Sequence, residues 1–319
     1  MDLKMRKNRV EIVTTLPTPY RIHLFNYLDR RFAEAGLEFR VHFMAYDDKV
    51  RPKEWFNSDS VLFKHRFWPG WVFQIKGKYF YLNLRLVLHI FFNSSQYLIV
   101  GGAWSTFTNV LISLFCLKKR QIKVCWFEIN TERVSNYGKI SFQIKKYLLS
   151  KYPAVAIPGN DAIDAVKKLI NNKKTEILPL PNLIDENRFK PRSAFPIDEL
   201  NEFKKRILPV VPTGKIAILP ARHSKEKGVI EFIEGVKNVE FNNWQILLVG
   251  KGPLQNDVLN LIRKYNLENH FICIDFISYN DMPKMYAISD LFILPSIWDH
   301  NPLTVIEALH CALPVMLSQ

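Results

Sequence analysis

The chain has 319 residues, 48% of them hydrophobic, and this size and composition predict a globular protein with two cores of ordinary size. Its four cysteines are far apart and form no C-x-x-C pair, which argues against a disulfide scaffold or a zinc site, and no apolar run reaches the roughly 20 residues of a membrane span. The net charge of +14 suits anionic partners, but Lys and Arg are spread over the whole length without a nucleic-acid-binding motif, so nucleic acid is not an expected partner.

Apolar strands alternate with amphipathic helices through the first half, the pattern of a parallel sheet covered on both faces. The expected strands lie at 10–16, 39–46, 97–102, 123–129, 154–159 and 176–181, and the helices at 20–35, 110–119, 142–152 and 162–170. Residues 47–78 are less regular and rich in aromatic side chains. They are compatible with a lid or surface loop for an apolar partner, or with additional core packing.

Four prolines between Pro191 and Pro212 mark a change in composition, which we interpret as a domain boundary. The strand and helix alternation then restarts, with expected strands at 215–221, 244–250, 271–277, 291–296 and 314–318. The fold class is therefore α/β, with two tandem doubly wound (Rossmann-like) domains. The first should span 1–190, a linker region 191–213, and the second domain 214–319.

Ligands of doubly wound domains bind beyond the carboxyl ends of the strands. In the second domain these positions hold two cations, two glycines, an apolar residue and an acid: Arg222, Lys227, Gly250, Gly252, Ile277 and Asp299. Cations can neutralise a diphosphate, and glycines allow the backbone to approach a ligand closely. Each residue alone is a weak signal, because a single cation after a strand is commonly solvated.

A short helix after the last of these strands can hold a charged ligand. Asn301 can cap it and Pro302 suits its first position, leaving the backbone N–H groups of Leu303 and Thr304 free for an anion. Glu307 lies one turn further among apolar neighbours, where a carboxylate needs a partner. That partner is either a ligand hydroxyl group, such as those of a ribose, or a group of the protein itself.

Asp299 and Glu307 stand eight positions apart, as in the paired-acid motif of family-four retaining glycosyltransferases of the GT-B fold, and the segment ARHSKEKG resembles that family's Arg and Lys donor motif. LPLPNLIDENRFKP, YNDMPKMYAISDLFILPS and PTPYR extend the resemblance over nearly the whole chain. It implies a hexosyltransferase that transfers a sugar from a UDP- or GDP-linked donor with retention of anomeric configuration, and without a metal or other cofactor. Arg222 and Lys227 would stabilise the diphosphate, Glu307 would bind the ribose, and Asp299 the donor sugar. The catalytic set is these four residues.

In the first domain, the positions comparable to the donor site are expected to face the acceptor: Tyr20, Arg21, Gly101, Gly102 and Glu128. Glu128 is alternatively an exposed loop acid without a function. The sequence departs from the family pattern in two ways. Asp299 replaces the usual Glu of the first acid position, and the chain ends at Gln319, before the family's final elements. We therefore expected the second domain to be incomplete.

The leading hypothesis is an enzyme of cell-surface polysaccharide or glycolipid synthesis, such as lipopolysaccharide or capsule, that uses a glycan or lipid-linked acceptor. It would be cytoplasmic and peripheral on the inner face of the plasma membrane, with its basic charge on anionic lipid. A solvated basic surface is the alternative explanation of that charge. A non-catalytic module that binds nucleotide or a partner protein is the second hypothesis. An NAD-linked oxidoreductase is a third, but it lacks the dinucleotide fingerprint.

Overall fold

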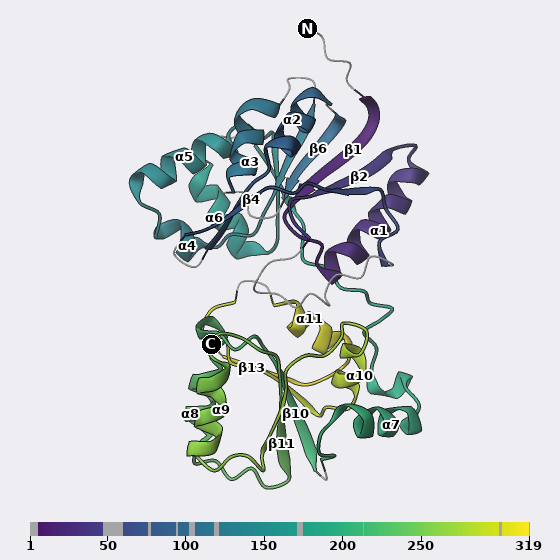
Figure 1. The fold of residues 1–319 in the computed structure, drawn as a ribbon, viewed down its shortest axis with the longest axis vertical. Coiled ribbons are helices and arrows are strands. Elements are labelled where there is room, and N and C mark those ends of the chain that lie inside the picture. Colours follow the sequence, from purple (N-terminus) through teal and green to yellow (C-terminus); the bar gives the residue numbers. More distant parts are fainter. Residues whose placement is uncertain are drawn as a thin grey trace. The chain divides into compact units, whose positions relative to one another are not determined.

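The computed structural model describes residues 6–46, 60–75, 78–93, 95–101, 106–117, 121–170, 175–212, 214–299 and 302–318. The chain forms two compact units, Met1–Leu183 and Ile184–Gln319 (Figure 1). The boundary therefore precedes the predicted one at residue 190. The predicted linker contains helix α7 (Ile197–Ile207), and its Leu200 and Phe203 are buried in the core of the second unit. The prolines at 191–213 flank this helix and do not mark an extended linker.

The first unit contains a parallel sheet whose described strands follow the order β3-β2-β1-β6-β7-β8-β9, together with an antiparallel hairpin, β4-β5. Its strands are β1 (Arg6–Thr14), β2 (Glu38–Phe43), β3 (His65–Phe67), β4 (Trp71–Ile75), β5 (Lys78–Leu82), β6 (Ser95–Gly101), β7 (Ile122–Trp126), β8 (Ala154–Ile157) and β9 (Glu176–Pro179). Its helices are α1 (Pro19–Glu34), α2 (Leu84–Phe92), α3 (Phe107–Leu111), the π-helical turn η3 (Ile112–Cys116), α4 (Thr131–Ser135), α5 (Lys139–Leu149) and α6 (Asn160–Leu169).

Both faces of the first sheet are covered, which explains why its strands are nearly continuous apolar runs. On one face, Phe25 of α1 packs with Phe39 and Phe43 of β2. On the other, Leu86 and Ile90 of α2 join a second cluster that also includes residues of η3, α5 and α6. The predicted strand and helix alternation is confirmed for this unit.

The second unit contains a parallel sheet whose described strands follow the order β12-β11-β10-β13-β14. Its strands are β10 (Lys215–Pro220), β11 (Trp244–Val249), β12 (Phe271–Ile274), β13 (Leu291–Leu294) and β14 (Val315–Leu317). Besides α7, its helices are the short turns η4 (Arg192–Ala194) and η5 (Lys225–Lys227), and α8 (Val229–Val236), α9 (Gln255–Lys264), α10 (Met282–Ala287) and α11 (Leu303–His310). Two α/β units with parallel sheets confirm the predicted fold class. Across the described parts of the chain, no helix has both the length and the hydrophobicity that a bilayer crossing requires.

Candidate active site

The topology of the second sheet creates a crevice at one position. From β10 the chain builds β11 and then β12 on one side, and it later returns to pair β13 with the other side of β10. Connections that leave two adjacent parallel strands in opposite directions open a crevice beyond their carboxyl ends. Arg222 and Lys227 follow β10, and Asp299 follows β13. The two segments that the sequence singled out therefore meet at the switch point.

Lys227 and Asp299 form an ion pair between their Nζ and Oδ2 atoms, and both side chains are largely shielded from solvent. The loops that carry them are also joined through the backbone, because the N–H of Trp298 donates to the carbonyl of Glu226 at 3.1 Å. Gly228 adopts φ +64°, and a Cβ there would lie 2.0 Å from the carbonyl oxygen of Pro295. A glycine is required at this contact, which brings Lys227 to Asp299.

Arg222 is exposed at the end of β10, and it adds to the positive potential of this loop. The pKa of Glu226 reflects this positive potential. Burial raises the pKa of Glu226, but the hydrogen bond from Ser224 (2.6 Å) and the charges of Arg222 and Lys227 outweigh burial, so the net shift is downward. The loop therefore carries two cations and an ionised acid.

Glu307 is buried in α11, with 6% of its surface exposed. The hydroxyl group of Tyr286 in α10 donates to its Oε2 at 2.8 Å. Burial raises the pKa of Glu307 from 4.5 to about 7, against the opposing effect of this hydrogen bond. Of the two partners considered for this acid, the structure thus supplies one from the protein itself. The carboxyl group is close to half-ionised at neutral pH, and its negative form is disfavoured until further donors reach it.

Two tyrosines near Glu307 were missed by sequence reasoning. Tyr286 is fully buried, and Tyr279 is buried enough that burial, followed by the charge of Glu307, raises the pKa of its hydroxyl group. Phe189 contacts the rings of both tyrosines. The only sequence signal for Tyr286 is its place in an apolar helix pattern, which does not reveal that its hydroxyl group points at an acid.

Helix α11 begins at Leu303, so Pro302 occupies the N-cap position and not the first helical position that we predicted. A proline at the N-cap offers no side-chain acceptor, and no side-chain cap is present among the described residues. Leu303 and Thr304 lie in the first turn of α11, and their N–H groups therefore have no intrahelical partners. The predicted cap, Asn301, lies outside the described residues.

Gly250 and Gly252 approach the backbone of the β10 loop closely. A Cβ on Gly250 would lie 2.3 Å from the carbonyl oxygen of Ala221, and one on Gly252 would lie 2.3 Å from that of His223. Packing within the protein is therefore sufficient to explain both glycines, and their predicted donor contact stays a prediction. Ile277 follows β12 and packs partly buried against the core.

The first unit has a comparable switch point, because the chain adds β2 and β3 on one side of β1 and then returns to add β6 on its other side. Arg21 bonds the hydroxyl group of Thr14 at the end of β1, and its guanidinium lies 5.0 Å from the centre of the Trp126 ring at the end of β7. Arg21 therefore sits at the carboxyl edge, beside Tyr20. The remaining acceptor-side predictions are Gly101, which ends β6, the exposed Glu128, whose Oε1 accepts from Asn182 at 3.4 Å, and Gly102, which lies outside the described residues.

Among the described residues of the first unit, one group of acid and histidine side chains is close enough to hold a metal ion. Possible ligand atoms of Glu11, His42 and His89 lie within 4.8 Å of one another. However, Trp68 Nε1 donates to His42 Nδ1 at 2.9 Å, and an indole nitrogen is only a donor. Neutral His42 then carries its proton on Nε2, which faces Glu11 Oε1 at 3.5 Å. The arrangement fits a buried acid facing a histidine proton better than a metal centre.

The second unit matches a known family model. Residues 201–319 match the model described as glycosyl transferases group 1. The match covers this part of the chain, which is less than half of it. The match contains all four residues of the predicted catalytic set.

Two relatives have known activities in their names. An Escherichia coli UDP-Gal:alpha-D-GlcNAc-diphosphoundecaprenol alpha-1,3-galactosyltransferase is 28% identical over 45% of this chain and 36% of its own length. An alpha-monoglucosyldiacylglycerol synthase from Acholeplasma laidlawii is 24% identical over 88% of this chain and 73% of its own length. The first match therefore spans little more than a third of that relative.

Solved structures extend the likeness to both units. The structure of Anabaena Alr3699/HepE in complex with UDP-glucose matches with a TM-score of 0.69 at 14% identity, covering 96% of this chain and 80% of that one. At this identity the match establishes the fold alone. The chain has the two-unit GT-B fold.

Proposed function

We propose that this protein is a retaining, metal-independent hexosyltransferase. It moves a sugar from a UDP- or GDP-linked donor, held by the second unit, to a lipid-linked or oligosaccharide acceptor, held by the first. The observation that carries the proposal is the Lys227–Asp299 pair at the switch point of a unit that matches the glycosyl transferases group 1 model.

The chemistry follows from where charge develops. Breaking the bond between sugar and nucleotide leaves negative charge on the diphosphate, and fixed cations favour that transition state over the ground state. Arg222 and Lys227 supply those cations, and the N–H groups of Leu303 and Thr304 add dipoles of the same sign. Asp299 holds Lys227 in place before the donor arrives, and it accepts hydrogen bonds from hydroxyl groups of the sugar afterwards.

Glu307 binds the ribose of the nucleotide. The two hydroxyl groups of a ribose supply the donors that its buried carboxylate needs, so donor binding favours the ionised form. We further propose that the acceptor is part of a cell-surface polysaccharide or glycolipid and that the protein works at the cytoplasmic face of the plasma membrane. The names of the two relatives above support a lipid-linked acceptor.

The test is transfer of radiolabelled sugar from a panel of UDP- and GDP-sugars into lipid extracts, with EDTA present throughout. We expect transfer with one donor and retention of configuration in the product by NMR. Lys227→Ala should lower kcat by about 10²- to 10³-fold. The matched control is Arg192→Ala, because Arg192 pairs with Asp290 at the opposite edge of the sheet and is exposed. Donor binding without transfer or hydrolysis would instead support the non-catalytic module.

A further inference from the structure

Helix α2 exposes an apolar side to solvent. Its Leu86 and Ile90 are buried under the helix, yet Leu84, Leu88 and Phe92 on other sides are 44%, 55% and 52% exposed. A surface helix ordinarily places polar residues there. The exposed side of α2 therefore lacks a partner within the described part of the chain.

The apolar surface continues onto the neighbouring elements. Turn η3 packs against α2, and its Leu114 and Phe115 are 41% and 63% exposed. Helix α3 packs against both α2 and β5. We call the exposed residues of α2 and η3 the apolar face: Leu84, Leu88, Phe91, Phe92, Leu114 and Phe115.

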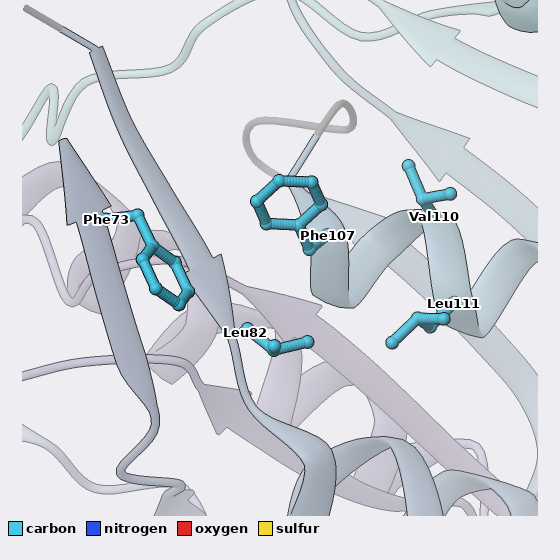
Figure 2. A pocket seen from close by; sticks show the side chains of 5 residues that line it. All are labelled: Phe73, Leu82, Phe107, Val110 and Leu111. Atoms are coloured by element: carbon cyan, nitrogen blue, oxygen red, sulfur yellow. The ribbon is translucent and has the colours of Figure 1, made fainter. Parts of the chain in front are cut away.

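A cavity of about 440 Å³ lies beside the apolar face, between α3 and the β4-β5 hairpin. Figure 2 shows the five side chains that line it, all apolar: Phe73, Leu82, Phe107, Val110 and Leu111. Trp71, two residues before Phe73 on β4, is 60% exposed. Such a lining offers no hydrogen-bonding group to a polar ligand, so it suits hydrocarbon.

The charge of the first unit indicates which kind of partner the apolar face binds. Residues 1–183 contain 29 Lys and Arg against 14 Asp and Glu, whereas residues 184–319 contain 15 against 16. The first unit therefore carries all of the net positive charge, although Lys and Arg occur over the whole length of the chain. Arg85 lies within α2 and is exposed.

We propose that the apolar face inserts into the hydrocarbon of an anionic bilayer, with Arg85 at its phosphate groups and the net positive charge of the first unit attracting the protein to it. The proposal rests on the proposed function, since it places the acceptor-side unit on the membrane that holds a lipid-linked acceptor. An exposed apolar face on a positively charged unit is the composition of an interfacial membrane anchor. Lys and Arg side chains reach the phosphate layer while their stems stay in contact with hydrocarbon.

The test is co-sedimentation of the full chain with vesicles of phosphatidylcholine containing 30% phosphatidylglycerol, without any sugar donor. Leu88→Ser/Phe92→Ser should lower the partition coefficient about tenfold or more, because two half-exposed apolar side chains no longer enter the bilayer. The matched control, Ile197→Ser/Val239→Ser, alters two exposed apolar residues of the second unit and should bind like wild type. Pure phosphatidylcholine should bind wild type more weakly.

A second measurement does not depend on that variant. Brominated acyl chains should quench tryptophan fluorescence of the wild-type protein on these vesicles, and Trp71→Phe should remove part of the quenching. Equal sedimentation of the double variant and wild type, together with no quenching, would overturn the proposal. So would a wild-type dimer that the double variant dissociates and that vesicles leave intact. Sedimentation without transfer would refute only the enzymatic function, whereas transfer to a detergent-dispersed acceptor without sedimentation would refute only the anchor.

Discussion

Replacing Glu307 with Gln should stabilise the protein while removing donor binding. Burial raises the pKa of Glu307 from 4.5 to about 7, so the folded state holds this proton over a pH range in which the unfolded chain has released it. Stability must then fall as pH rises from about 4.5 to about 7. At about 1.4 kcal/mol per pKa unit, the ionised carboxyl group lowers the free energy of unfolding by about 3 kcal/mol above pH 7.

Gln keeps the shape of Glu307 and can still accept the Tyr286 hydrogen bond, but it cannot ionise. The stability difference between Glu307→Gln and wild type should therefore grow by about 2.5 kcal/mol between pH 5 and pH 8. All other groups titrate alike in the two proteins and cancel. A residue that costs stability in this way is one retained for function.

The assay is urea unfolding at pH 5, 6, 7 and 8, followed by circular dichroism, with the transition that the variant moves assigned to the second unit. Glu234→Gln is the control, because Glu234 is an exposed acid of α8 in the same unit. The change with pH should be larger for Glu307→Gln than for this control. A Glu307→Gln difference that stays constant from pH 5 to pH 8 would contradict the raised pKa of Glu307.

Three further predictions concern the same unit. Donor affinity of wild type should rise from pH 6 to pH 8 as Glu307 ionises, and isothermal titration should find Glu307→Gln weak and insensitive to pH; a parallel rise in the variant would assign the effect elsewhere. Tyr286→Phe removes the bond that lowers the pKa of Glu307, so the midpoint of that affinity change should move to higher pH, and an unchanged midpoint would contradict the hydrogen bond. Gly252→Ala should destabilise by about 1–3 kcal/mol in thermal unfolding, because its Cβ would press on the backbone of His223. Gly235→Ala is its control, in a helix with open space around the Cβ, and should stabilise by about 0.5–1 kcal/mol.

Local sequence patterns were sufficient to predict the strands and helices and to single out candidate site residues. The alternation of strands and helices follows from short-range periodicity, and so the two parallel sheets could be predicted. The placement of Arg222, Lys227 and Asp299 after strands was visible in the same way. The boundary at Leu183 was not, because the prolines that suggested a later one flank helix α7, which is packed into the second unit.

What the sequence alone determined is the supply of groups: a net charge of +14, two cations after a strand, and a buried-looking acid eight positions after another. What the tertiary structure decided is which groups meet. Lys227 pairs with Asp299 across 72 positions, Tyr286 turns its hydroxyl group to Glu307, and the described residues cover only one apolar side of α2. Periodicity records that a side chain is apolar or charged, but the contact that satisfies it is set by the order of strands in a sheet, which no local pattern contains.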